Sequence, residues 1–155
     1  LTPAQPRDCH AVTPAVAITF LNIVLSQNRS TAHKVWKTGF KWGVLNCVPR
    51  ARHDEIYATA LYDSGKVYGN LADGIVIREE RFQVPTLTIA ASKDRATPAK
   101  AVRKMKDKYA RAPVPGDFRE YENHAHWILD EPGSEQVAAD ILDWLELKVG
   151  LPANA

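Results

Sequence analysis

The feature that most constrains this chain is an alternation of strand and helix patterns between residues 84 and 145. Residues 84–91 form a short apolar run rich in β-branched side chains, which is typical of a buried strand. Residues 117–122 form a second strand pattern. A helical pattern follows each strand, and the second one presents four apolar residues on one face: Val137, Ile141, Leu142 and Leu145. This order predicts an α/β fold.

A carboxylate and a histidine follow the two predicted strands. Asp94 comes after the run at 84–91, and His126 comes after the pattern at 117–122. After Asp94, Thr97 and Pro98 favour a helix start, because threonine can cap a helix and proline fits its first turn. Short side chains at the ends of rigid strands can converge with little loss of entropy. We therefore expect Asp94 and His126 to meet.

Together these segments resemble the C-terminal part of the core of an α/β-hydrolase. The resemblance is carried by three short stretches: Val84-Pro85-Thr86-Leu87, Asp94-Arg95-Ala96-Thr97-Pro98, and His126-Trp127 before Glu131-Pro132-Gly133. In that family the triad acid follows the penultimate core strand and the triad histidine follows the last one. The resemblance implies that Asp94 is the acid and that His126, not His124, is the base.

The nucleophile motif of that family is missing from this sequence. The motif is G-x-S-x-G, and no two glycines of the chain enclose a serine at this spacing. Ser64 lacks the strand-to-helix setting that exposes a nucleophile. Cys47 is an alternative because histidine and aspartate can activate a thiol, although most buried cysteines only pack. We expect the chain to begin after the nucleophile, with residues 1–6 resembling the end of the strand that follows it.

The sequence divides at a charged run, residues 78–82. We predict that residues 1–82 form a mostly helical cap segment and that residues 83–155 form the C-terminal part of a hydrolase core. Thr13-Pro14 starts a helix whose residues 15–25 are apolar on nearly all sides. Such a helix can line an apolar pocket, be buried in the cap or form an oligomer contact. Three aromatic residues are the candidates for substrate binding: Phe20, Trp36 and Trp127. For Trp36, a place in the cap's own core is the alternative.

Composition excludes several classes of partner. The formal charge is +2, and the basic run at 100–111 is read as a solvated helix face, so no nucleic acid is expected. Two distant cysteines, Cys9 and Cys47, indicate neither a disulfide framework nor a structural zinc site. No metal or cofactor is implied, and a cytoplasmic location is the default. Residues 15–25 are too few to span a membrane.

Three functional hypotheses follow. The chain can be the C-terminal portion of a serine hydrolase acting on a small apolar ester or acyl substrate, with the nucleophile supplied by another segment, such as a separate N-terminal half. It can be an inactive half-hydrolase that binds a hydrophobic small molecule. It can also be a self-assembling half-hydrolase that uses Asp94 and His126 as an acid/base pair. All three leave the strand at 87–91 with an edge that invites pairing, so we predict an oligomer.

Overall fold

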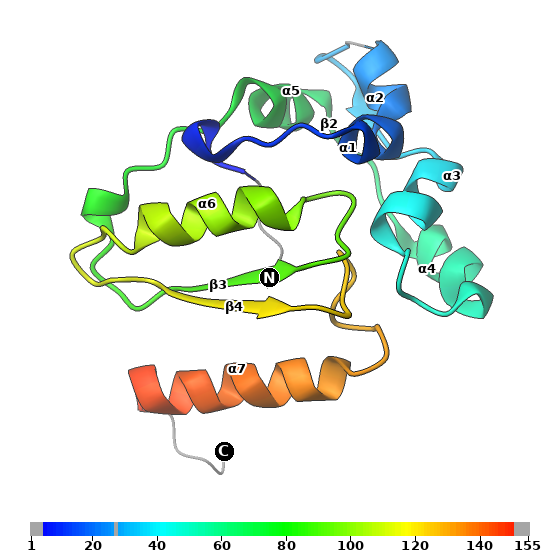
Figure 1. Ribbon diagram of the computed structural model, residues 1–155. Helices are drawn as coiled ribbons and strands as arrows, with labels where there is room; N and C mark the ends of the chain where they lie inside the picture. Colours follow the sequence, from blue (N-terminus) through cyan, green and yellow to red (C-terminus); the bar gives the residue numbers. More distant parts are fainter. Residues whose placement is uncertain (1–4, 27, 151–155) are drawn as a thin grey trace.

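The C-terminal part of the chain is a layered unit in which two parallel strands lie between two helices (Figure 1). The computed structural model describes residues 5–26 and 28–150. Strands β3 (Leu87–Ala91) and β4 (Asp117–Tyr121) pair in parallel. Helix α6 (Ala99–Tyr109) covers one face of the pair and α7 (Ser134–Val149) covers the other. The predicted order of strand, helix, strand and helix is confirmed.

Two apolar clusters hold these layers together. Ala90 packs with Val102 and Met105 on the α6 side. Ile89 packs with Ile128 and Val137 on the α7 side. Successive side chains of a strand point to opposite faces, so β3 must be apolar on both faces to enter both clusters. This explains the continuous apolar run in the sequence.

The buried face of α7 differs from the predicted one. Val137 and Trp144 are buried, whereas Leu142 is 59% exposed. The indole Nε1 of Trp144 donates a hydrogen bond of 2.8 Å to Oδ2 of Asp117 in β4. This bond allows the tryptophan to face the sheet, and the inward stripe then runs through positions 137, 141 and 144. The prediction that Leu142 lies on the core face is wrong.

The preceding part of the chain is built from short elements. Its helices are α1 (Pro14–Thr19), α2 (Leu21–Ser26), α3 (Lys37–Gly39), α4 (His53–Thr59) and α5 (Gly65–Asp73). Its strands β1 (Ala32–His33) and β2 (Asp63–Ser64) pair antiparallel. Its other helical turns are η1 (Arg7–Cys9), η2 (Phe40–Val44), η3 (Arg50–Arg52) and η4 (Glu79–Arg81).

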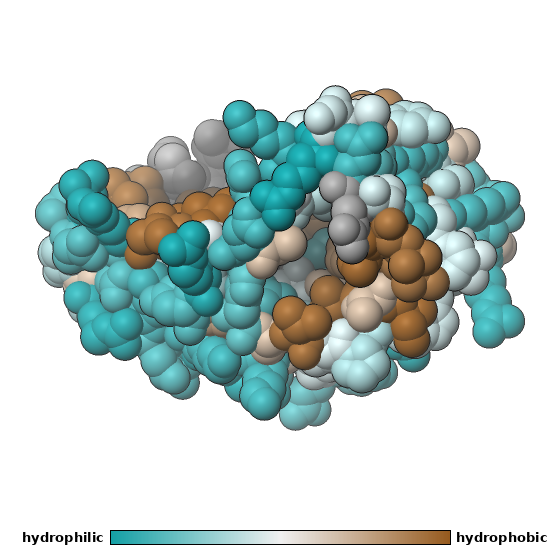
Figure 2. Space-filling view, turned by 90° about the horizontal axis from the view of Figure 1, so that it is seen from above, coloured by the Kyte–Doolittle hydropathy of each residue, from teal (hydrophilic) through white to brown (hydrophobic). Residues whose placement is uncertain are grey.

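The apolar helix predicted for residues 15–25 is interrupted at Phe20. Thr13 caps α1 as expected, with its Oγ1 accepting from the N–H of Val16 at 3.3 Å. Phe20 leaves helical geometry with φ −105° and ψ 21°, and α2 begins at the next residue. Four apolar side chains of these helices stay exposed: Ile18, Leu21, Val24 and Leu25. Figure 2 shows that apolar groups on the upper face stand apart, with hydrophilic side chains between them.

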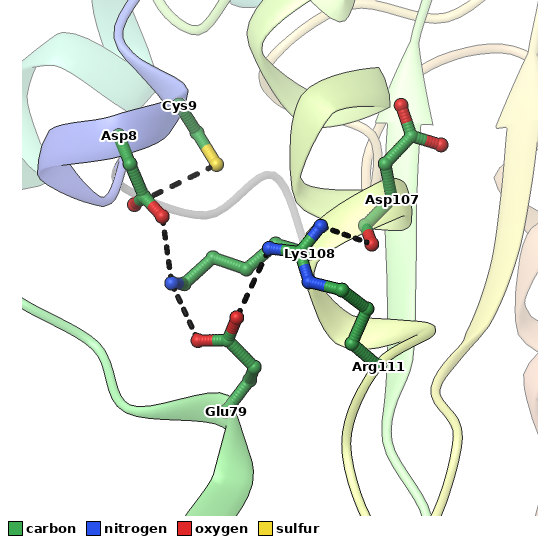
Figure 3. A network of polar contacts seen from close by, with 6 residues as sticks. All are labelled: Asp8, Cys9, Glu79, Asp107, Lys108 and Arg111. Carbon is green, nitrogen blue, oxygen red and sulfur yellow. Dashed lines mark hydrogen bonds and ion pairs between the residues drawn. The ribbon is translucent and has the colours of Figure 1, made fainter.

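A network of ion pairs fastens the N-terminal turn η1 to α6. The Nζ atom of Lys108 lies 2.7 Å from Oδ2 of Asp8 and 2.6 Å from Oε2 of Glu79 (Figure 3). Arg111 adds a second cation, with its Nη2 3.0 Å from Oε1 of Glu79. Lys108 is buried, so the prediction of a wholly solvated basic face on α6 is wrong at this residue. Of the strand end predicted at residues 1–6, residues 1–4 lie outside the described residues.

Candidate active site

Asp94 is fixed in the turn between β3 and α6. Its Oδ1 accepts the backbone N–H groups of Ala96 at 2.8 Å and Thr97 at 2.7 Å, and its carboxylate is fully buried. Helix α6 begins at Ala99 after Pro98, without a side-chain cap. The expectation that Thr97 caps this helix is therefore wrong, because the carboxylate of Asp94 occupies the turn and Thr97 is its donor.

His126 meets the second oxygen of the same carboxylate. Its Nδ1 lies 3.0 Å from Oδ2 of Asp94, and 27% of its side chain is exposed. Because a carboxylate only accepts hydrogen bonds, this contact places a proton on Nδ1. In the neutral ring Nε2 is then the nitrogen that can accept a proton. The structure thus brings the two predicted triad residues together, while their catalytic role remains a prediction.

A second histidine–carboxylate pair supports the loop that carries His126. The Nδ1 of His124 lies 3.2 Å from Oε2 of Glu131, and the same oxygen accepts the N–H of Ala125 at 2.7 Å. Glu131 is 2% exposed and His124 is 7% exposed. These contacts fix the backbone just before His126 and so help to set where its imidazole projects. They also explain why His124 is unsuited to be the base, since its ring is buried in a structural contact.

No role for Glu131 was predicted from the sequence, where this residue is only part of the stretch Glu131-Pro132-Gly133 that carries the family resemblance. The available signal was a single acid placed shortly after two histidines and before a turn-forming Pro-Gly pair. Gly133 adopts φ +90°, which allows the chain to turn directly into α7.

An apolar hollow of about 200 Å³ includes in its wall Trp127, the residue that follows His126 in the chain. It is lined by Lys34, Val35, Phe40, Ala60, Leu61, Asp63, Tyr68 and Trp127. The rings of Phe40 and Trp127 meet edge to face, with centroids 6.0 Å apart. His126 itself is not among the lining residues, so Trp127 connects the hollow to the loop that carries the candidate base. A volume of this size suits a small apolar group, since pockets for drug-sized ligands are about 300–1,000 Å³.

The three predicted substrate-binding aromatics occupy different places. Trp127 lines the apolar hollow. Phe20 is not a lining residue, but its ring centroid lies 6.4 Å from that of Tyr68, which is one. Trp36 is not among the lining residues. Its Nε1 donates to the carbonyl oxygens of Ile18 and Thr19 at 3.2 and 3.1 Å, which joins α3 to α1. Phe40 and Tyr68 complete the aromatic wall.

The two nucleophile candidates within the chain are Ser64 and Cys47. The Oγ of Ser64 accepts the N–H of Lys66 at 3.2 Å and caps α5. Burial raises the pKa of the Cys47 thiol, and the negative charge of Glu131 raises it further. A raised pKa lowers the fraction of thiolate, which is the nucleophilic form. Neither environment activates its side chain as a nucleophile.

Comparison with known families identifies the chain. In the described part of the chain, no three His, Cys, Asp or Glu side chains gather as a metal ion would require. No helix there is both long and apolar enough to cross a membrane. The model of a family described as the dienelactone hydrolase family matches residues 7–149. This match includes the cap segment as well as the strands that carry Asp94 and His126. No curated protein matches the chain.

Proposed function

The chain belongs to the dienelactone hydrolase family, part of the α/β-hydrolase superfamily, and on that basis we propose that it provides the acid and base of an ester- or acyl-hydrolysing site. The observation that carries this proposal is the contact of 3.0 Å between Nδ1 of His126 and Oδ2 of Asp94. The other oxygen of that carboxylate is held by two backbone donors. An acid fixed in this way can orient an imidazole without reorganising during the reaction.

In the proposed mechanism His126 is the general base and then the general acid. Its Nε2 takes the proton of the nucleophile as the nucleophile attacks the acyl carbon, and later returns that proton to the leaving group. Asp94 keeps the Nδ1 proton in place and stabilises the imidazolium that forms between these two steps. Partial exposure of the ring allows the reacting groups to reach it.

We further propose that the nucleophile comes from a segment outside these 155 residues or from a partner chain. The sequence has no G-x-S-x-G, and both Ser64 and Cys47 lie in surroundings that do not activate them. Strand β3 supports a partner, because within the described residues β4 is the only strand that pairs with it. An unpaired edge of a buried strand is a ready site for another strand.

The apolar hollow supports a small apolar ester or acyl compound as the substrate class. Its aromatic wall of Phe40, Tyr68 and Trp127 can cover an alkyl or aryl group, and Trp127 is bonded directly to the candidate base His126 along the chain. Among the predicted binding residues, Trp127 should contribute most, so Trp127→Ala should raise KM more than Trp36→Phe does. An equal rise for both variants would argue that the substrate does not occupy this hollow.

The experiment that tests the function labels the nucleophile of the isolated assembly. The chain is purified with the polypeptides that bind it and treated with a fluorophosphonate, which reacts with activated serines. We expect labelling of a serine that lies outside these 155 residues, and a loss of about 10³- to 10⁴-fold in labelling rate in His126→Ala. His10→Ala, a histidine remote in sequence from the site, serves as the matched control and should keep the wild-type rate. Labelling that His126→Ala leaves unchanged would contradict the proposal.

The alternative is a catalytically inactive half-hydrolase that binds a hydrophobic small molecule, as a homo-oligomer. The specific observation in its favour is that the apolar hollow is present in a sequence that has no G-x-S-x-G. In that case His126→Ala would change only the affinity for the ligand. Native mass spectrometry separates the two, because the alternative predicts multiples of the 17.2 kDa chain and no second polypeptide.

A further inference from the structure

A second hollow, lined by cap residues and by Arg95 from the turn after β3, is strongly basic. It has a volume of about 590 Å³ and is lined by Lys37, Thr38, Lys41, Trp42, Asn46, Val48, Arg50, His53 and Arg95. It shares no lining residue with the apolar hollow beside Trp127. The turn η2 separates them, since Phe40 lines the apolar hollow while Lys41 and Trp42 line the basic one.

The basic hollow concentrates more positive charge than the whole chain carries. Lys37, Lys41, Arg50 and Arg95 supply four cations, and Asp54, which pairs with both lysines, supplies one carboxylate. The surplus of three positive charges exceeds the formal charge of +2 for all 155 residues. Charges of one sign around a concave surface focus the electric field and raise the local concentration of an oppositely charged ligand.

Three of the four cationic groups of this hollow are held in place before any ligand arrives. The guanidinium of Arg95 lies 4.4 Å from the ring centroid of Trp42, and its Nη1 donates to the Trp42 carbonyl oxygen at 3.1 Å. The ammonium groups of Lys37 and Lys41 lie 2.6 and 2.8 Å from the same oxygen, Oδ1 of Asp54. Their hydrogen bonds hold the pKa of Asp54 at about 2, so this carboxylate stays charged and keeps the two lysines adjacent. Groups that are already ordered lose less entropy on binding.

Hydrogen-bonding capacity remains after these internal contacts. An ammonium has three N–H donors and a guanidinium has five, so Asp54 and Trp42 use only part of this capacity. In the described residues no carboxylate forms an ion pair with Arg50 or Arg95. Two arginine forks and two ammonium groups around one hollow match the oxygens of a phosphate group, which arginine can bind through two parallel hydrogen bonds.

We propose that this basic hollow binds a small molecule bearing a phosphomonoester or pyrophosphate group. The charge surplus matches a dianionic or trianionic head group, and the volume lies in the range of about 300–1,000 Å³ that is typical of small-ligand sites. A nucleic acid is a poorer match, because a duplex carries a charge about every 1.7 Å along its axis and calls for an extended row of cations. Neither Asp94 nor His126 lines this hollow, although Arg95 directly follows Asp94 in the chain. The binding test below measures affinity and not hydrolysis, so its result does not depend on the hydrolytic function.

The test is a titration of the purified chain with pyrophosphate at constant ionic strength. Calorimetry measures the affinity, and backbone amide NMR identifies the residues that respond. We expect a Kd below about 1 mM, with the largest shifts at residues of η2 and at Arg95. The double variant Lys41→Gln with Arg50→Gln should weaken binding by about tenfold or more, which is 1.4 kcal/mol or more. The control double variant Lys66→Gln with Lys100→Gln removes the same charge from exposed positions outside the hollow and should bind like the wild type.

Three outcomes would overturn the proposal. Equal weakening in both double variants would show that only the diffuse positive charge of the chain attracts the anion. Equal or tighter binding of citrate, a tricarboxylate, would assign the hollow to carboxylates rather than phosphates. Shifts that centre on residues outside η2 and Arg95 would place the anion elsewhere. The NMR spectrum of each variant also reports whether it is folded, so a misfolded variant cannot be mistaken for a failed site.

Discussion

The strand-and-helix unit at residues 87–149 and the preceding cap segment position their side chains by different means. In the first, β3 and β4 pair over five residues, and α6 and α7 have 11 and 16 residues. In the cap no described helix exceeds nine residues, and each strand has two. The regular unit holds Asp94 and His126, whereas the cap forms most of the walls of both hollows.

This difference teaches which part of the molecule must be rigid. The acid and base follow strand ends, where backbone donors and a buried Glu131 fix them. The cap relies on individual side chains instead. Asn22, for example, donates from Nδ2 to the carbonyl of Lys34 and accepts the N–H of Trp36 at its Oδ1, which holds the chain between α2 and α3. Proton transfer requires a geometry that a rigid element provides, whereas a pocket wall tolerates variation.

The largest expected effect of a single change in the regular unit is on catalysis, in Asp94→Asn. An asparagine can still accept the N–H groups of Ala96 and Thr97, so the turn and the fold should survive. It cannot hold the Nδ1 proton of His126 as a carboxylate does, and activity of the complete assembly should fall by about 10⁴-fold. Steady-state kinetics measure this loss. Asp107→Asn, at an exposed position of α6, is the control, and an equal loss there would refute the specific role of Asp94.

The next effect concerns the support of the catalytic loop, in Glu131→Ala. This change leaves the ring of His124 and the N–H of Ala125 without their buried acceptor, at a cost of about 3 kcal/mol of unfolding free energy. Urea denaturation measures it. Glu131→Gln keeps an acceptor oxygen and should recover part of the loss, whereas Glu122→Ala, at an exposed position, should change little. A stability unchanged by Glu131→Ala would mean that the second pair does not support the loop.

A third prediction concerns the acid sensitivity of the contact between η1 and α6. The hydrogen bond from Lys108 lowers the pKa of Glu79 from its ordinary value of 4.5 to about 2. A lowered pKa in the folded state stabilises the protein above pH 4.5, and this contribution is lost as the pH falls toward 2. The unfolding free energy of Lys108→Met should therefore decline less over this interval than that of the wild type. Lys100→Met should retain the wild-type slope, and identical slopes for all three proteins would contradict the assignment.

The smallest effect is expected in the cap, in Thr13→Ala. The change removes the hydroxyl that caps α1 and should cost about 1 kcal/mol of unfolding free energy. Thr13→Ser keeps the hydroxyl and should restore most of this stability in the same denaturation measurement. Because the cap does not hold the acid or the base, the rate of labelling at saturating probe should stay unchanged. A large loss of that rate would break the distinction between a rigid catalytic unit and a cap that only forms walls.

Local patterns in the sequence predicted the regular unit, and the resemblance to α/β-hydrolases predicted the meeting of Asp94 with His126. The apolar run of β3 could be predicted because a strand buried on both faces must be apolar on both. The inward face of α7 could not be predicted, because Trp144 turns inward through a hydrogen bond to Asp117, a residue of another element. The break at Phe20 was also missed, since an apolar run gives no sign of where a helix bends.

Ion pairs between residues far apart in the chain could not be predicted for a related reason. The sequence pattern places Lys108 on a solvated helix face, and only the fold brings Asp8 and Glu79 to it. The basic hollow likewise gathers cations from α3, η2, η3 and the turn after β3, and this turn lies far from the other three along the chain. Such sites depend on the placement of short cap elements, and local periodicity does not determine this placement.

The most direct test of the central claim is the tautomer of His126 in solution. A correlation NMR spectrum of the histidine ring nitrogens, recorded where the imidazole is neutral, identifies which nitrogen carries the proton. If Asp94 orients the base as described, the proton of His126 lies on Nδ1 and this signal is lost or altered in Asp94→Asn, while the signal of His10 stays the same in both proteins. A wild-type His126 with its proton on Nε2 would contradict the account, because the contact with Oδ2 of Asp94 would then lack its donor.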